Sequence, residues 1–169
     1  DSSPSGNVHG MPLAASMNVG HESLTNLYYE GIKVKPENVY IIGARNLDPG
    51  EERLAKKLNL NLYTQDDINS LGLENILKET ISKIKSSNVN GVHLSFDIDV
   101  LDAEISPGTG VAEENGINVE EAKIILDKIL SEKFVTSMDF VEFNPKLDVD
   151  DKTAKICLDL LEFIFKKLN

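Results

Sequence analysis

The sequence predicts an α/β protein in which a largely parallel sheet is covered by helices on both faces, a three-layer arrangement. Short apolar segments alternate with amphipathic helical segments along the chain, and this alternation is typical of parallel sheets joined by right-handed crossovers. Polar residues that could bind a ligand or take part in catalysis follow the ends of several apolar segments. In parallel sheets of this kind, ligands bind at the carboxyl ends of the strands. The 169 residues suffice for one domain.

The first half of the chain begins with a loop and then alternates helices and strands. Residues 1–10 combine Ser, Pro, Gly and Asn, which is typical of turns. Pro12 suits the first turn of a helix, bounded apolar runs indicate buried strands, and apolar residues at i, i+3 and i+4 indicate amphipathic helices. We therefore expect helices at 12–17, 51–58, 66–71 and 73–85, and strands at 39–43 and 60–63.

The second half continues the same alternation to the end of the chain. An apolar run predicts a strand at 91–100, before a loop that contains Pro107 and Gly108. An amphipathic helix is expected at 118–130. The next strand, 134–143, is stopped by Asn-Pro, and an amphipathic helix at 151–168 closes the fold.

The composition excludes several functional classes. The chain has 17 Lys+Arg against 28 Asp+Glu, a formal net charge of -11, which disfavours nucleic acids and anionic membrane surfaces as partners. Cationic metals and basic small molecules remain natural ligands. The single cysteine, Cys157, excludes an intrachain disulfide and a Cys-rich zinc site, and fits a cytoplasmic location. No apolar run reaches the ~18 residues of a membrane span.

The sharpest motif is SFDIDVLD, residues 95–102, followed by SPGTG at 106–110. Asp97 and Asp99 are two apart, so on a strand they would point to the same face. Their neighbours are apolar, and two partly buried carboxylates side by side are costly unless a cation lies between them. Oxygen ligands favour Mg, Ca or Mn. The alternative is a strand end with solvated aspartates or turn caps.

Histidines offer a second set of candidates. His9 lies in the Gly-flanked loop SGNVHGMP, before a predicted helix. It is a candidate metal ligand, a candidate proton shuttle or an ordinary loop residue. His21 presents the same choice, whereas His93, inside an apolar strand, is expected to be structural.

Two further acidic positions follow predicted strands. In RNLDPGE, residues 45–51, Asp48 and Glu51 either bind a cationic amine together or form an acidic capping box, and the spacing favours the cap. Glu142 lies in VEFNP at the end of the last strand. Glu142 is either an exposed carboxylate at the edge of the sheet or a carboxylate in a binding pocket. The spacing alone does not distinguish the two.

Together these segments resemble the ureohydrolase family, which contains the arginases and the agmatinases, and they are most similar to its arginase branch. SFDIDVLD with SPGTG resembles the family's metal-binding signature and its Pro-Gly-Thr-Gly loop. SPSGNVHGMPLA, VYIIGARNLDPGE and FVEFNP occur in the family's order and spacing. The resemblance covers essentially the whole chain and implies a hydrolase that converts L-arginine to L-ornithine and urea by means of a dimanganese-bound hydroxide.

The resemblance implies roles for the residues nearest the chemistry. Asp97 matches a ligand that bridges two Mn²⁺ ions, and Asp99 matches a ligand of one ion. His9 matches the histidine that shuttles protons. Glu142 matches the carboxylate that orients the guanidinium group.

The resemblance also assigns the residues that would hold the amino-acid end of the substrate. Ser5 and Asn7 match positions that bind mainly the α-carboxylate of arginine. Asp48 and Glu51 match positions near its α-amino group, which overturns the preference for a capping box. The family further implies a homo-oligomer, either a trimer or a hexamer.

Two departures from the family pattern affect what this chain is expected to do. Val111 stands where the family loop usually has a hydroxyl-bearing Thr. The family's Asp-Ala-His-x-Asp motif and a further His ligand, which precede SGNVHG, are not in this sequence. Residues 1–169 are therefore expected to be the C-terminal portion of a single α/β domain, and we expect this portion alone to be inactive because it lacks those metal ligands. The alternatives are an agmatinase or other ureohydrolase, or a noncatalytic ureohydrolase-like domain.

Overall fold

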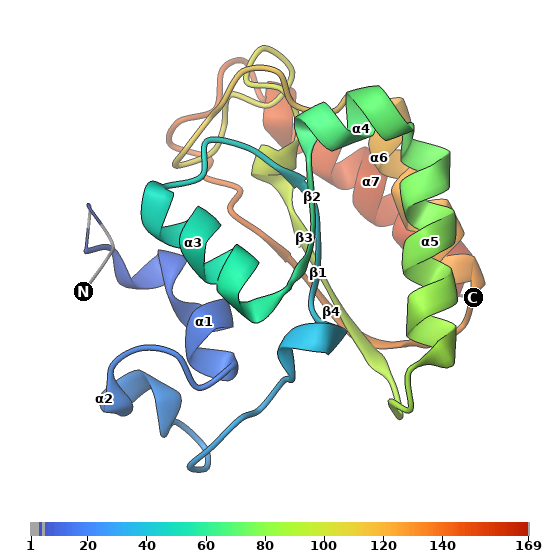
Figure 1. Cartoon of the computed structure of the whole chain (residues 1–169). Coiled ribbons are helices and arrows are strands. Elements are labelled where there is room, and N and C mark those ends of the chain that lie inside the picture. The colour runs from blue at the N-terminus through green and yellow to red at the C-terminus, as the bar shows by residue number, and fades with distance from the viewer. Residues whose placement is uncertain (1–3, 5, 169) are drawn as a thin grey trace. The chain divides into compact units, whose positions relative to one another are not determined.

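The computed structural model describes residue 4 and residues 6–168, and it confirms the α/β class (Figure 1). The helices and strands alternate as the sequence predicts. In chain order they are η1 (Val8–Gly10), α1 (Pro12–Ser16), α2 (Glu22–Thr25), η2 (Pro36–Asn38), β1 (Tyr40–Ala44), α3 (Pro49–Leu58), β2 (Asn61–Thr64), α4 (Gln65–Leu71), α5 (Leu73–Ser86), β3 (Val92–Asp97), η3 (Ile98–Val100), α6 (Val119–Ser131), β4 (Val135–Val141) and α7 (Lys152–Leu168), where η marks a short 3₁₀ helix.

The chain divides into two compact units. The first contains Asp1–Ile42 and Asn46–Leu62, and the second contains Gly43–Arg45 and Tyr63–Asn169. Strands β1 and β2 form one two-stranded sheet, and β3 and β4 form another.

The second unit is built on the parallel pair β3–β4. In its register Phe96 lies opposite Phe140, and their rings stack with centroids 5.1 Å apart. Helices α5, α6 and α7 lie on one side of these strands (Figure 1). Leu126 of α6 and Leu160 of α7 are fully buried there, and the lone Cys157 of α7 is buried with 6% exposure. The apolar faces predicted from periodicity form this core.

The opposite face of β3–β4 is polar. His93 of β3 is hydrogen-bonded through Nδ1 to Ser137 Oγ (2.9 Å) and through Nε2 to Asp139 Oδ2 (3.2 Å), both on β4. The three side chains are exposed. His93 thus pairs the two strands, in agreement with its predicted structural role.

One predicted strand is too long. The segment 91–100 was expected to be extended throughout, but β3 ends at Asp97 and residues 98–100 form η3. The reason is local: the Asp97 side chain accepts a hydrogen bond from the Asp99 backbone N–H and caps the turn. The apolar Ile98 and Val100 are compatible with either conformation, so their pattern could not reveal the change.

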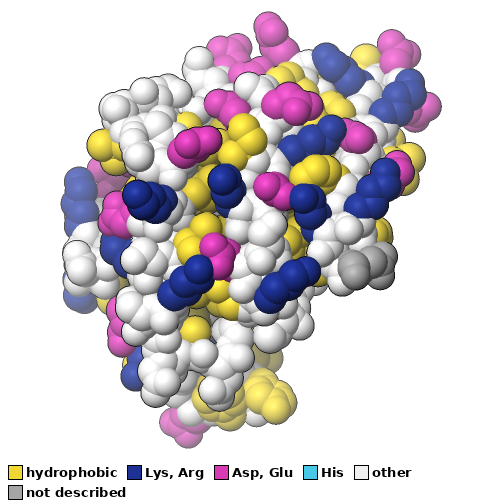
Figure 2. Space-filling model, turned by 90° about the vertical axis from the view of Figure 1, so that its right-hand side faces the viewer, with side chains coloured by type: hydrophobic (Ala, Val, Ile, Leu, Met, Phe, Trp, Pro, Cys, Tyr) yellow, Lys and Arg dark blue, Asp and Glu magenta, His cyan; other side chains and the backbone are white. Residues whose placement is uncertain are grey.

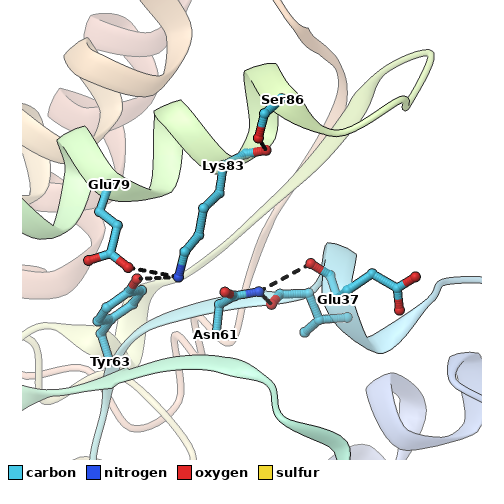
Figure 3. Close-up of polar contacts among 7 residues, drawn as sticks. Glu37, Asn61, Tyr63, Glu79, Lys83 and Ser86 are labelled. Atoms are coloured by element: carbon cyan, nitrogen blue, oxygen red, sulfur yellow. Dashed lines mark hydrogen bonds and ion pairs between the residues drawn. The ribbon is translucent and has the colours of Figure 1, made fainter.

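Polar clusters support the helices around each sheet. Lys83 of α5 forms an ion pair with Glu79 (2.7 Å) and donates a hydrogen bond to the Tyr63 hydroxyl (3.4 Å), as Figure 3 shows. In the first unit, the Asn61 amide donates to the backbone carbonyls of Glu37 and Val39. An exposed ion pair such as Lys83–Glu79 stabilises a fold only slightly.

The surface of the helical layer carries charges of both signs. Figure 2 shows basic and acidic side chains interspersed with apolar ones on this face. A shallow hollow of about 690 Å³ is lined by residues of α5 and α6 together with Glu132, and none of its lining residues is a predicted site residue. The described part of the chain contains no helix with the length and hydropathy of a membrane span.

Candidate functional site

The structure brings Asp97 and Asp99 together by a turn rather than by strand alternation. Asp97 is the last residue of β3 and Asp99 lies in η3. The Asp99 N–H donates to Asp97 Oδ1 at 3.0 Å, which fixes the backbone of one residue to the carboxylate of the other. The expectation that both side chains share one face of a strand was therefore wrong, although their proximity was predicted.

The Asp97–Asp99 pair is electrostatically costly as it stands. The pKa of Asp97 is raised to about 7, chiefly by burial and also by the charges of Asp99 and Glu142, while the hydrogen bond from the Asp99 N–H opposes the rise. Burial also raises the pKa of Asp99, although the hydrogen bond with Asp97 and the charge of Arg45 oppose the rise. A carboxylate pair in this state gains stability when a cation neutralises it.

Arg45, which sequence reasoning passed over, contacts the same turn. It follows β1 directly and belongs to the second unit. Its Nη1 donates to the Val100 carbonyl (2.8 Å) and its Nη2 to the Asp99 carbonyl (2.5 Å). The sequence offered only a weak signal for this contact, a single arginine directly after an apolar strand. Its partners are distant along the chain and could not be identified from the sequence.

Glu142 follows β4 and contributes a third carboxylate. It is exposed and has a backbone φ of 69°, in the left-handed region that non-glycine residues rarely adopt. Its charge acts on both Asp97 and Asp99. Backbone strain of this kind is concentrated at functional sites. It favours the interpretation of Glu142 as a carboxylate of the site over that of an exposed residue at the sheet edge.

The SPGTG loop runs beside Glu142. Asn144 N–H donates to the Gly108 carbonyl (2.8 Å), and Thr109 forms a bridge with Phe143. The loop is held from its other side by Thr153 Oγ1, which accepts from the Gly108 N–H at 2.8 Å. Within the described residues, the Thr109 hydroxyl is buried without a partner. Val111, just after the loop, is 48% exposed.

The remaining predicted residues lie in the first unit. His9 is exposed in η1, and Asn7 is the residue that precedes this turn. Ser5 lies outside the described residues. His21 has a structural role, since its Nδ1 accepts from the Ser23 N–H and caps α2.

Asp48 and Glu51 form a capping box at the start of α3, as their spacing predicts. The Asp48 N–H donates to Glu51 Oε2 at 2.8 Å. In this structure Glu51 is therefore engaged with the backbone. Its assignment to the substrate amine comes from the resemblance alone.

The described residues supply only part of a metal site. No group of three or more His, Cys, Asp or Glu side chains among them is arranged to hold a metal ion. Asp97 and Asp99 nevertheless fit a hard divalent cation, because they are oxygen donors, partly buried, and their charged forms are destabilised by burial. They provide two donors toward a shell that needs more.

Comparison with known proteins finds consistent similarities. A family model described as the Arginase family matches residues 1–165. The arginase of Bacillus subtilis (strain 168) is 44% identical over 167 residues, which make up 99% of this chain and 56% of that protein. Its crystal structure aligns with a TM-score of 0.90, at 44% identity, over 96% of this chain and 56% of that one.

A second solved structure agrees. The native structure of the arginase from Bacillus caldovelox aligns with a TM-score of 0.91 at 40% identity, over 96% of this chain and 54% of that one. The chain thus spans about half the length of the relatives it matches.

Proposed function

Because the chain belongs to the arginase family, we propose that the protein to which these residues belong hydrolyses the guanidinium group of L-arginine to L-ornithine and urea. The observation that carries the proposal is the carboxylate cluster of Asp97, Asp99 and Glu142 at the ends of two adjacent parallel strands. We further propose that residues 1–169 are the C-terminal portion of a single α/β domain.

Asp97 and Asp99 are the residues of this chain that would hold Mn²⁺, two ions per complete site. When bound, a pair of such ions makes a water molecule acidic enough to act as a nucleophile at neutral pH. The described residues provide too few donors for both ions. The remaining ligands are expected from the part of the family fold that this chain does not span.

Glu142 would bind the guanidinium of the substrate. The guanidinium pKa exceeds ~12, so the group is cationic at neutral pH and pairs with a carboxylate. Binding it at Glu142 would hold its carbon facing Asp97 and Asp99 and keep it in the charged form. The net charge of -11 favours the approach of a cationic substrate, chiefly by raising the association rate.

His9 would deliver a proton to the amine of the departing ornithine, work that suits a group whose ordinary pKa is near neutral. Ser5 and Asn7 would bind the α-carboxylate of the substrate. Asp48 and Glu51 would lie near its α-amino group, which requires Glu51 to leave or share the hydrogen bond that caps α3.

The test compares L-arginine with agmatine, which lacks the α-carboxylate. Urea release from the complete protein with Mn²⁺ is expected to be much faster with L-arginine, because Ser5 and Asn7 act only on a substrate with that group. Equal or faster turnover of agmatine would replace this proposal with an agmatinase.

A noncatalytic ureohydrolase-like domain is the second candidate, and it is raised by the observation that the described residues bring two candidate metal ligands together without a third. The two candidates differ in the residues encoded before Asp1. An Asp-x-His-x-Asp stretch there supports the enzyme. A complete protein without it, which releases no urea from either substrate, supports the noncatalytic domain.

A further inference from the structure

The end of β1 and the turn η3 are held unusually close together. Gly43 has a φ of +88°, and a Cβ atom built on it would lie 2.8 Å from Val100 Cγ2. Only glycine fits both the backbone conformation and the space. Arg45, two residues later, reaches the same turn through two hydrogen bonds. Gly43 and Arg45 thus mark one contact between this strand end and residues 99–100.

The two hydrogen bonds of Arg45 use the particular geometry of its side chain. The planar guanidinium presents parallel N–H groups, and here they donate to the consecutive carbonyls of Asp99 and Val100. Its Nε is buried and has no hydrogen-bond partner among the residues that the structure describes. Burial of an unpaired donor costs free energy. The position of the Arg45 side chain therefore does not maximise its own hydrogen bonding.

The contact extends to both carboxylates. Arg45 fixes the carbonyl of Asp99, and the N–H of the same residue donates to Asp97 Oδ1. The orientation of the Asp97 carboxylate therefore depends on the backbone of Asp99, which in turn depends on the guanidinium.

We propose that Arg45 is a positioning residue for the Asp97–Asp99 pair, and that it holds the two carboxylates in the arrangement that receives a divalent cation. The inference rests on the proposed function in taking Mn²⁺ as that cation. Arg45 itself donates to backbone carbonyls and does not contribute a ligand.

Charge and position predict opposite effects of replacing this residue. A positive guanidinium near a cation site repels the cation, so if charge dominated, Arg45→Met would tighten Mn²⁺ binding. If position dominates, Arg45→Met loosens binding. Arg45→Lys also loosens it, because lysine keeps the charge but lacks the planar fork. The sign of the change in affinity therefore distinguishes the two roles.

The experiment titrates the 169-residue chain with Mn²⁺ and follows the paramagnetic broadening of the backbone amide signals of Asp97 and Asp99. We expect both Arg45 variants to bind Mn²⁺ at least about fivefold more weakly than the unmodified chain. The matched control is Arg53→Lys, at an exposed position of α3, which should leave the affinity unchanged. The carbonyl ¹³C signals of Asp99 and Val100 should shift in the Arg45 variants only.

Unchanged or tighter Mn²⁺ binding in the Arg45 variants would overturn the proposal, as would an unmodified chain whose Asp97 and Asp99 signals do not respond to Mn²⁺. Circular dichroism identifies any variant that fails to fold. If Arg45→Met does so, Arg45→Lys decides alone, and its loss of folding would assign the residue to stability instead. A failure of the arginase proposal would appear as absent urea release from the complete protein, and it would not alter the comparison of Mn²⁺ affinities in the 169-residue chain.

Discussion

Asp97 links the chemistry of the site to the stability of the chain. Its pKa in the folded protein is about 7, above its ordinary value of 3.8, chiefly because of burial. The folded state therefore holds the proton more tightly than the unfolded state. The stability that this group contributes is complete below about pH 4 and is lost as the pH rises through 7.

Replacing Asp97 with Asn should remove this pH dependence in the metal-free chain. Asn cannot ionise, so the melting temperature of the Asp97→Asn variant should match that of the unmodified chain at pH 4 and exceed it by about 10 °C at pH 8. Thermal melts in EDTA check this. Asp66→Asn, at an exposed site of α4, is the control. A constant difference between Asp97→Asn and the unmodified chain at all pH values would contradict the assigned pKa.

His9 is exposed in η1, and its proposed role is proton transfer rather than metal binding. His9→Asn in the complete protein should slow urea release by about 10²–10⁴-fold while both Mn²⁺ ions stay bound. Elemental analysis together with a urea assay measures the two properties. Loss of Mn²⁺ in this variant would make His9 a ligand.

At the scale of elements, the turn that carries Asp99 is also held from the other side. The segment around Asp102 pairs with the residues before α6: Ile117 N–H donates to the Val100 carbonyl, and Asp102 N–H donates to the Ile117 carbonyl, each at 3.1 Å. Gly116 allows this close approach, since a Cβ atom on it would lie 2.4 Å from the backbone of Leu101 and Asp102.

Gly116→Ala should therefore destabilise the second unit. Backbone atoms cannot move aside as a flexible side chain does, and we expect a loss of about 1–3 kcal/mol in the free energy of unfolding. Urea unfolding followed by circular dichroism measures it. The control is Gly10→Ala, since a Cβ atom on Gly10 would meet nothing within 4 Å. Equal urea midpoints for the two variants would show that the segment can separate at little cost.

The elements themselves were predictable because their signals are local. Periodicity located β1, α5, α6 and α7 to within a few residues. The spacing of Asp48 and Glu51 favoured the capping box that begins α3, although the resemblance had overturned that preference. The end of β3 was not predictable, because Ile98 and Val100 continue the apolar alternation through a turn. The role of Arg45 was not predictable either, since its partners lie 54 and 55 residues away along the chain.

For the whole molecule, the number of ligands sets the expected activity. The described residues of the 169-residue chain offer Asp97 and Asp99 but no third ligand arranged with them, and two ions require more donors than that. We expect this chain alone to bind Mn²⁺ weakly and to release no urea from L-arginine. A urea assay on the purified chain with added Mn²⁺ decides. Turnover comparable to that of an intact arginase would show that two carboxylates suffice.

The buried thiol of Cys157 gives this chain a reporter of its own motions. It lies inside the packing of α7 with 6% exposure, and burial raises its pKa to about 11. The reactive thiolate is therefore nearly absent while the helix is docked. Since no other cysteine competes with it, the rate at which a thiol reagent labels the chain counts the openings of α7. Labelling with and without Mn²⁺ would then reveal whether a cation at one end of the sheet steadies the helix that packs behind it.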